Sequence, residues 1–264
     1  MKKFLAIALA AVLLFALAAC AGNKTTDGNA TDGNVTDGNA TAGDVKPVLS
    51  MATEAGFMPY EYYEGDEIVG IDVEIAKLIA DKLGMELEIA DIDFNQIIPS
   101  VQSGKYAMGM AGLTVDATRL ESVNFSTSYA TGVQVVIVKD GGSVATLDDI
   151  AGKKIGVQTS TTGDIIASEE FGEESIQRFE RTADAVAALV NDKIDCVIID
   201  NEPAKKFVEA NEGLKILETS YAVEDYAICF AKENTELLEK VDTALKELIA
   251  DGSVKAIIDK YIAA

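Results

Sequence analysis

Strand-like apolar runs alternate with helical periodicity along most of this chain, and the alternation constrains its fold more than any other feature. Residues 48–52 and 86–90 have the apolar content and length of strands. Between them, residues 72–83 carry apolar side chains at helical spacing, and Gly84 provides a stop. A short helix is predicted over residues 97–103. Strands separated by helices pair in parallel, so the pattern predicts an α/β fold.

The same alternation recurs in the second half of the chain. A β-branched run at residues 132–138 is long enough for a strand that leaves one domain for another. Residues 194–200 are predicted as the central strand of a second unit, and residues 226–230 as a return strand. The other elements predicted here are a strand over 154–158, helices over 162–170, 183–191 and 203–210, and amphipathic helices over 235–249 and 253–261. The chain from residue 46 onward is long enough for one large or two modest domains.

The N-terminus predicts an export signal. Two lysines precede an apolar stretch that ends in small residues, with the length and flanks of a secretory signal peptide rather than a transmembrane anchor. We assign residues 1–19 to this signal peptide. Leu17-Ala18-Ala19-Cys20 looks like the lipobox of bacterial lipoproteins, which implies lipid attachment at Cys20; an ordinary signal peptide that ends in cysteine is the alternative. No other segment of the sequence is long and apolar enough to span a bilayer.

Residues 20–45 are predicted to be a flexible linker behind the lipid anchor. The repeat Thr-Asp-Gly-Asn recurs every five residues and carries almost no apolar side chain, so the segment cannot bury a core. Its Asp, Asn and Gly content also allows a reading as calcium ligands, but it has no apolar positions to stack such a coil. A random coil of this length spans about 25–30 Å, enough to hold a folded unit clear of its anchor.

The acidic balance and the missing histidines exclude several classes of function. The formal net charge is −22 at pH 7, which disfavours nucleic acid and anionic membrane surfaces as partners. The chain has no histidine, the commonest general base and metal ligand, and neither a metal nor another cofactor is expected. Apart from Cys20 there are only Cys196 and Cys229, both in apolar runs. They are predicted core residues, and a bridge between them stays open.

Arg119 is the first candidate for binding an anion. It follows Thr114 by five residues, after a run of small residues that leaves backbone N–H groups accessible. A hydroxyl, backbone N–H groups and a guanidinium suit a carboxylate, because arginine presents two parallel donors to two oxygens. A solvated arginine on a surface loop is the alternative for this residue alone.

Two further candidate groups lie at a helix start and at a strand end. Thr161 and Thr162 open a predicted helix, whose N-terminal N–H groups can hold a carboxylate; simple capping by the hydroxyls is the alternative. Asp200 ends the central apolar strand, and ligands of open α/β sheets bind at the carboxyl ends of strands. Its carboxylate suits an ammonium group, and capping of the helix that starts near Pro203 is the alternative.

Several short motifs occur in an informative order and spacing. They are Phe57-Met58-Pro59-Tyr60, Gly70-Ile71-Asp72-Val73, residues 99–105, residues 114–119, Asn124-Phe125-Ser126 and residues 195–200. Together they resemble the polar amino-acid solute-binding lipoproteins of ABC importers (bacterial extracellular solute-binding proteins, family 3), over residues 47–262. The resemblance implies a type II periplasmic-binding-protein-like fold, with two mixed-sheet α/β lobes joined by two hinge strands. Lobe 1 is expected at residues 46–132 and 229–264, and lobe 2 at residues 133–228.

The resemblance also implies a role for each candidate residue. Arg119 and Thr114 would bind the carboxylate of an amino acid, and the turn at Thr161 and Thr162 would donate further hydrogen bonds to the same carboxylate. Asp200 would bind the ammonium group, helped by Thr114 and the backbone carbonyl of Gly112. The residues implied for the ligand side chain are Glu54, Phe57, Tyr60, Phe94 and Gln158.

The chain departs from the family at the positions that face the ligand side chain. Glu54 stands where relatives commonly have aspartate, and Ala111 where they usually have serine. The acidic residue usual just before the arginine is replaced by Thr118. An acidic wall residue and a negative field disfavour glutamate and aspartate as ligands. Polar neutral, cationic and cystine-like amino acids stay open.

The function implied by the resemblance is capture of a polar amino acid and its delivery to an ABC importer permease. The protein is expected to be a lipid-anchored monomer on the extracytoplasmic face of the cell membrane. Closure of the lobes, with residues 133–138 and 226–230 as the crossing strands, would trap the ligand. An enzyme is not expected, since the sequence has no histidine, nucleophile elbow or phosphate loop. The alternatives are an amino-acid sensor for a membrane receptor and a dehydratase on the same scaffold.

Overall fold

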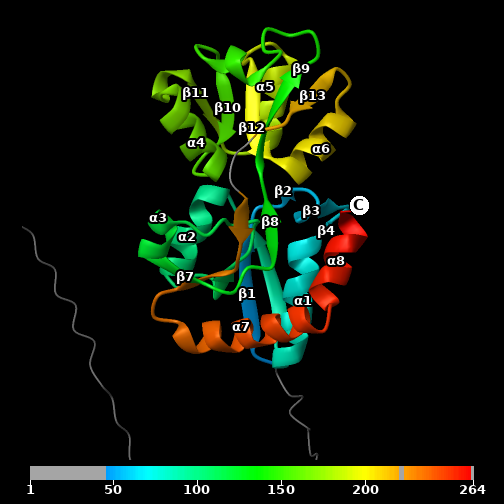
Figure 1. The fold of residues 1–264 in the computed structure, drawn as a ribbon. Coiled ribbons are helices and arrows are strands. Elements are labelled where there is room, and N and C mark those ends of the chain that lie inside the picture. Colours follow the sequence, from blue (N-terminus) through cyan, green and yellow to red (C-terminus); the bar gives the residue numbers. More distant parts are fainter. Residues whose placement is uncertain (1–45, 220–222, 263–264) are drawn as a thin grey trace, which may run out of the picture. The chain divides into compact units, whose positions relative to one another are not determined.

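The computed structural model describes residues 46–219 and 223–262, which form two α/β lobes (Figure 1). The predicted signal peptide at residues 1–19, the lipid-attachment residue Cys20 and the linker to residue 45 lie outside the described residues. None of the helices in the described part of the chain has the length and apolar surface that a bilayer crossing requires.

The first lobe is built on a five-stranded mixed sheet. Its strands, in spatial order, are β5 (Glu86–Asp91), β1 (Val48–Thr53), β6 (Met108–Gly109), β15 (Cys229–Ala231) and β7 (Val123–Phe125). β1 runs parallel to β5 and β6, whereas β15 runs antiparallel to both of its neighbours. The chain therefore returns to this sheet from the second lobe through β15.

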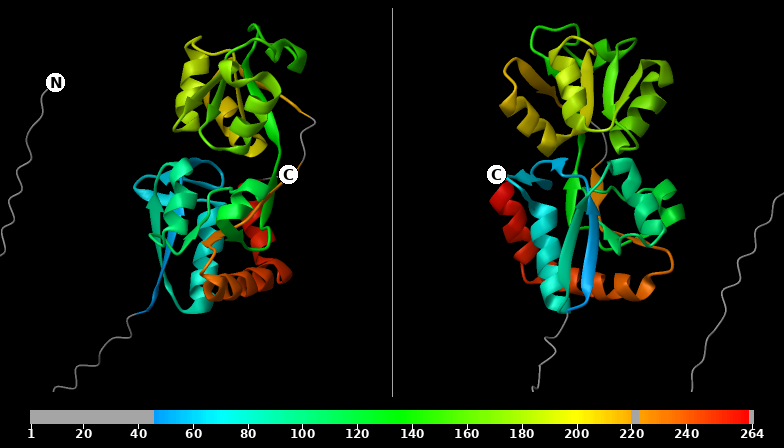
Figure 2. Two further views of the ribbon diagram at one scale, coloured as in Figure 1. Left: turned by 90° about the vertical axis from the view of Figure 1, so that its left-hand side faces the viewer. Right: turned by 180° about the vertical axis from the view of Figure 1, so that it is seen from behind.

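Helices cover both faces of the first sheet because successive strand side chains point to opposite sides. Leu49 and Met51 of β1 face a core that is completed by α1 (Ile71–Leu83), α7 (Thr235–Ala250) and α8 (Ser253–Tyr261). Figure 2 shows α1 and α8 side by side. Ala52 faces the other way, into a smaller core with α2 (Phe94–Gln102), next to α3 (Ala117–Ser122).

The second lobe repeats this plan. Its strands, in spatial order, are β11 (Ile176–Phe179), β10 (Ile155–Gln158), β12 (Cys196–Asp200), β9 (Gln134–Lys139) and β13 (Leu214–Leu217). β10 is parallel to β11 and β12, and β9 is antiparallel to β12 and β13. Residues 135 and 137 of β9 face α5 (Thr182–Val190) and α6 (Asn201–Ala210), whereas residues 136 and 138 face α4 (Thr162–Phe171).

The two buried cysteines lie in different sheets. Cys196 is in β12 of the second lobe and Cys229 in β15 of the first, and both are free thiols with no exposed surface. Burial raises the pKa of each thiol to about 12, so neither is an effective nucleophile at neutral pH. The bridge that the sequence left open is therefore not formed, and both cysteines fill core space.

A two-stranded ribbon stands where the chain passes between the lobes. β8 (Ala130–Gly132) pairs antiparallel with β14 (Glu224–Tyr226). The sequence instead placed the crossings in residues 133–138 and in one return strand over 226–230. The structure puts β9 wholly in the second sheet and divides the return strand into β14 and β15. The division arises because the N–H of Ala227 turns from β8 to donate to the carbonyl of Leu113, at 3.0 Å.

The remaining elements are small. β2 (Gly56–Phe57), β3 (Glu61–Glu64) and β4 (Glu67–Val69) form an antiparallel sheet beside the end of β1. Single turns of 3₁₀ helix occur at Leu147–Ile150 and Glu173–Ser175. β2 and β3 bear on function, because they carry side chains of the first lobe into the pocket described next.

Candidate ligand-binding site

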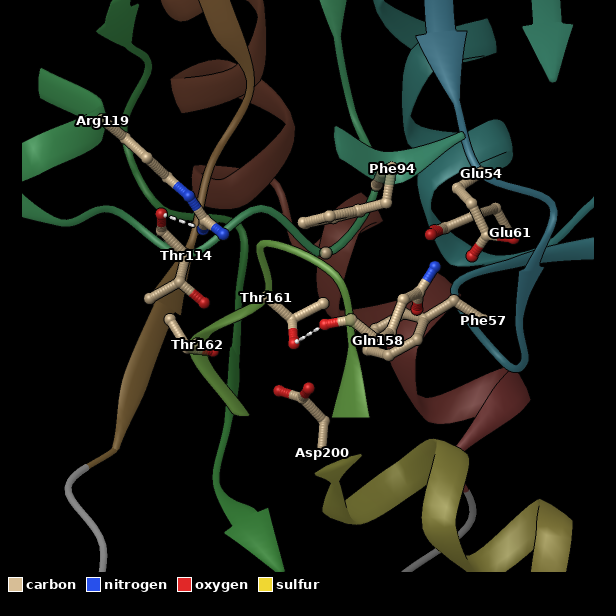
Figure 3. Close-up of a pocket in the computed structure, with 12 residues that line it drawn as sticks. Glu54, Phe57, Glu61, Phe94, Thr114, Arg119, Gln158, Thr161, Thr162 and Asp200 are labelled. Carbon is tan, nitrogen blue, oxygen red and sulfur yellow. Dashed lines mark hydrogen bonds between the residues drawn. The ribbon is translucent and has the colours of Figure 1, made fainter. Parts of the chain in front are cut away.

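Both lobes contribute side chains to one narrow pocket (Figure 3). The lining residues are Glu54, Phe57, Glu61, Phe94, Ala111, Gly112, Thr114 and Arg119 from the first lobe, and Gln158, Thr161, Thr162 and Asp200 from the second. Every residue that the sequence proposed for ligand binding is among them except Tyr60.

The lining residues stand where parallel strands end. Glu54 follows β1, Gln158 is the last residue of β10, and Asp200 is the last residue of β12. The carboxyl ends of strands are where open α/β sheets leave a crevice for ligands. The pocket is thus placed by the topology of two sheets, whose strand ends face one another.

Tyr60 belongs to the core beneath the pocket, so its predicted place in the first-lobe wall is wrong. Tyr60 is 1% exposed, and its ring packs between the rings of Phe57 and Tyr226, at centroid distances of 5.6 and 5.2 Å. Its neighbour Glu61 lines the pocket instead. Tyr60 is the last residue of the turn before β3, and its ring completes the core with Tyr226, whereas Glu61 opens the strand and lines the cavity.

Arg119 is held at the pocket by its own loop. Asp116 caps α3 by accepting from the N–H of Arg119 at 2.8 Å, and its carboxylate also lies 3.2 Å from the guanidinium. Nη1 donates to the carbonyl of Thr114 at 2.8 Å, and Nη2 to the carbonyl of Ser160 in the second lobe at 3.1 Å. The residue is 8% exposed, and its guanidinium carbon lies 5.6 Å from the centre of the Phe94 ring. Arg119 is therefore a buried, oriented cation rather than a solvated one.

Asp200 is the anion that the second lobe contributes to the pocket. It occupies the N-cap position of α6, yet the described structure gives its side chain no capping hydrogen bond, which argues against the capping alternative. Its carboxylate accepts from the hydroxyl of Tyr226 and is directed into the pocket (Figure 3). Burial, and then the charge of Glu224, raise the pKa of Asp200 to about 6. An ammonium group placed here would relieve both effects.

The start of α4 combines capping with pocket lining. The Thr161 hydroxyl accepts from the N–H of Asp164 at 3.2 Å, as an N-cap does, and donates to the carbonyl of Gln158 at 2.8 Å. Thr161 and Thr162 also line the pocket, so both sequence readings of this turn describe the same residues.

Glu224 is a neighbour of the site that the sequence did not single out. Its Oε2 accepts from the hydroxyls of Thr114 at 3.0 Å and Thr162 at 2.9 Å, and from the Gln134 amide at 3.2 Å. These bonds orient both threonines and join the two lobes at the edge of the pocket. In the sequence, Glu224 is one of two adjacent acidic residues and carries no signal that separates it from a solvated charge.

The opposite end of the pocket is acidic. Glu54 is nearly buried and forms an ion pair with Arg181 of the second lobe, whose guanidinium also lies 3.2 Å from Asp91. Burial raises the pKa of Glu54, and Arg181 opposes that rise. Gln158 is fixed beside them, since its amide donates to the carbonyl of Glu180 and accepts from the Thr182 hydroxyl, both at 2.9 Å. Arg181 was not predicted, because no local pattern links it to Glu54.

Glu61 was also missed, and it is the least satisfied group of the pocket. Both carboxyl oxygens are buried, and no donor group of the described residues reaches them, but the carboxyl group of Asp72 lies within hydrogen-bonding reach. Burial, and then the neighbouring charge of Asp72, raise the pKa of Glu61 well above its ordinary value of 4.5. Asp72 also has a raised pKa, about 6, although it accepts hydrogen bonds from Gly112 and Tyr129. Burial therefore favours the protonated form of Glu61.

Replacing Glu61 with glutamine should make the free protein more stable at pH 8. Because its folded pKa is raised, Glu61 contributes stability that is present below about pH 4.5 and is lost as the pH rises toward the folded pKa. Glutamine keeps the shape without the ionisation, so stability should fall less between pH 5 and pH 8. Urea unfolding at both pH values measures this. Glu64→Gln, on the exposed end of the same strand, is the matched control and should follow the native protein. A native pH slope in Glu61→Gln would contradict the assignment.

The described residues contain no group of three or more acidic or cysteine side chains that could hold a metal ion. What the pocket offers is one buried guanidinium, carboxyl groups from both lobes and an aromatic wall of Phe57 and Phe94. Such a set can bind a zwitterion by charge-assisted hydrogen bonds.

The sequence and the fold match known proteins. A sequence model of the bacterial extracellular solute-binding proteins, family 3, matches residues 49–264. The arginine-binding extracellular protein ArtP of Bacillus subtilis (strain 168) is 32% identical over 266 residues, covering 99% of this chain and 98% of ArtP. The structure of ArtJ, an arginine-, lysine-, histidine-binding protein from Geobacillus stearothermophilus, superposes with a TM-score of 0.78 at 36% identity, over 82% of this chain and 95% of ArtJ. An ancestral arginine-binding protein solved with glutamine gives a TM-score of 0.79 at 35% identity, over 83% and 99% of the two chains.

Proposed function

The chain belongs to the bacterial extracellular solute-binding proteins of family 3 and captures an amino acid outside the cytoplasm for an ABC importer, and we propose that this amino acid is basic. The family and the structural relatives are binding proteins, not enzymes. Among basic amino acids we place arginine first, because ArtP is an arginine-binding protein and ArtJ an arginine-, lysine-, histidine-binding protein.

The observation that carries the proposal is the distribution of charge in the pocket. Arg119 lies at one end, Glu54 and Glu61 lie at the other, beyond the ring of Phe94, and Asp200 of the second lobe lies between the two ends (Figure 3). Even with Glu61 protonated, two carboxylates line the pocket against one guanidinium, and a second guanidinium, that of Arg181, reaches Glu54 from beside the pocket. A basic amino acid carries one positive charge more than a neutral one, and this charge can pair with Glu54 beside Arg181. Glutamate or aspartate would add a further buried negative charge without a partner.

The proposed pose assigns each end of the pocket to one part of the ligand. Arg119 and the start of α4 hold the α-carboxylate, and Asp200 holds the α-ammonium, with help from Thr114 and the Gly112 carbonyl. The side chain then lies along Phe57 and Phe94 toward Glu54. Micromolar affinity needs about 8 kcal/mol. Charge-assisted hydrogen bonds contribute roughly 1.5–3 kcal/mol each, so a handful suffices after ordering costs.

The proposed mechanism is closure of the two lobes over the ligand. We place the rigid bodies at residues 46–132 with 229–264, and at residues 133–228, and we place the hinge in the ribbon of β8 and β14. Contacts of Arg119 with Ser160, and of Arg181 with Asp91, join the lobes beside the pocket and support this division. Closure excludes water and thereby strengthens each charged contact. A permease can then recognise the closed form.

The remaining parts of the proposal concern the N-terminus and assembly. We propose lipid attachment at Cys20, with residues 20–45 as a tether and the binding unit acting as a monomer. The extracytoplasmic place of the family supports the first of these. A sensor role uses the same pocket; no structural observation favours it over import.

A thermal-shift screen of the standard amino acids, with cystine and citrulline, tests the proposed ligand class. We expect arginine to raise the melting temperature most, lysine and histidine less, and glutamate not at all, because a ligand that binds only the folded state stabilises it by mass action. Citrulline has the shape of arginine without its charge and should give a smaller shift. No shift with any amino acid would reject capture by this pocket, and a preference for acidic ligands would reject the basic class.

A further inference from the structure

Arg181, a cation of the second lobe, pairs with Glu54, the carboxylate toward which the proposed pose directs the ligand side chain. Arg181 directly precedes α5 and extends its guanidinium to the first lobe. There it pairs with Glu54, at the end of β1, and with Asp91, at the end of β5, where Nη1 and Nη2 lie 3.2 and 3.4 Å from the two oxygens. Asp93 lies at 4.0 Å. These contacts join residues that are 90 and 127 positions apart.

The burial of the partners separates this ion pair from an ordinary surface pair. The side chain of Glu54 is 3% exposed and that of Asp91 is 19% exposed, whereas Arg181 is 32% exposed. A buried carboxylate is costly unless a cation or hydrogen-bond donors compensate it. Arg181 supplies that compensation only while the second lobe lies against the first. A ligand cation that reaches Glu54 must therefore share the carboxylate with Arg181 or displace it.

We propose that Arg181 is a specificity-determining residue, which competes with the ligand side chain for Glu54 and so reduces the preference of the pocket for a charged side chain over a neutral one. The inference rests on the proposed function and refines its ligand class. With Arg181 in place, a neutral polar side chain meets a compensated carboxylate and is tolerated. Without Arg181, Glu54 and Asp91 lack their cation, and a cationic side chain becomes strongly preferred.

A purely mechanical role for Arg181 makes a different prediction. If Arg181 only holds the closed lobes together, its loss lowers the affinity for every ligand by the same factor. If it sets the charge at the side-chain end, its loss changes the ratio of affinities for a charged and a neutral ligand of the same shape. Arginine and citrulline form such a pair, so their affinity ratio isolates the electrostatic role from the closure of the lobes.

The test is titration calorimetry of the full mature protein with arginine and with citrulline. In Arg181→Gln, we expect the ratio of the citrulline Kd to the arginine Kd to rise by about tenfold or more, because one unit charge beside the ligand cation is removed. Arg181→Lys keeps the charge and should retain most of the native ratio. Thermal melting of each ligand-free variant checks that the variant folds. We expect both variants to fold, because the Arg181 side chain is partly exposed.

Asn95→Ala is the matched control for closure. Asn95 donates to Glu180 of the second lobe at 3.3 Å, next to Arg181, and carries no charge. Its removal should change both Kd values by one common factor. An unchanged or smaller ratio in Arg181→Gln, with the native protein binding arginine, would overturn this inference alone. Failure of the native protein to bind any basic amino acid would reject the proposed function, and this inference with it.

Discussion

Arginine binding should be strongly weakened when Arg119 is replaced by methionine, with a Kd at least about 30-fold above the native value. The expected loss follows from burial, because removal of one member of a buried, hydrogen-bonded charge pair costs about 2–5 kcal/mol, and tenfold in Kd is about 1.4 kcal/mol. Here the ligand carboxylate would enter a nearly closed pocket without its counter-ion. Calorimetry at pH 7 measures the effect, and neutral and basic ligands should lose affinity together, since all share the carboxylate.

Two companion variants show whether Arg119 acts through its forked guanidinium. Arg119→Lys keeps the charge but not the pair of parallel donors, so its Kd should fall between the native and methionine values. Lys240→Met removes an exposed cation of α7, far from the pocket, and should bind like the native protein. If Arg119→Met folds and binds arginine with native affinity, our assignment of the carboxylate site is wrong.

Replacing Asp200 with asparagine should weaken binding by a similar factor while stabilising the free protein. Asparagine removes the only pocket carboxylate proposed for the ammonium group, and that pairing is again worth about 2–5 kcal/mol. In the free protein, burial and Glu224 raise the pKa of Asp200 to about 6. A raised folded pKa means that stability falls as the pH rises through about 6, so asparagine should relieve a destabilising charge at pH 8. Urea unfolding and calorimetry measure the two effects separately.

The pH dependence of binding distinguishes a counter-ion from a passive wall residue. Below about pH 6, Asp200 of the free protein carries a proton that the ligand ammonium must displace, so native affinity should fall as the pH drops from 7 to 5. The part of this fall that is due to Asp200 should be absent in Asp200→Asn. Equal pH slopes in the two proteins would show that other groups, such as Asp72, dominate the titration.

Local periodicity was sufficient to locate most helices and strands. The first strand, the following helix and the next strand were predicted at 48–52, 72–83 and 86–90, and occur as β1, α1 and β5 at nearly the same bounds. Gly84 ends α1 as predicted: it adopts φ 67°, and its N–H bonds to carbonyls of the last turn. Such features depend on neighbours within a few residues, so the sequence alone carries them.

Element boundaries set by distant partners were less accurate. The predicted return strand over 226–230 is interrupted because Ala227 pairs with Leu113 rather than with β8. Tyr60 and Glu61 are adjacent, and the sequence could not decide which one faces the pocket. That choice depends on the core that Tyr226 completes around the Tyr60 ring.

The sequence by itself determined the α/β alternation, and the family resemblance of its motifs predicted the two lobes and proposed Arg119 and Asp200 as the opposed charges of a ligand site. Strand ends and helix starts are local properties, and they are enough for the alternation. The tertiary structure alone decided that Arg181 pairs with Glu54, that Glu224 joins Thr114 to Thr162, and that Glu61 is buried beside Asp72. These groups meet only where two lobes come together, and contacts between side chains about 100 residues apart follow no sequence period.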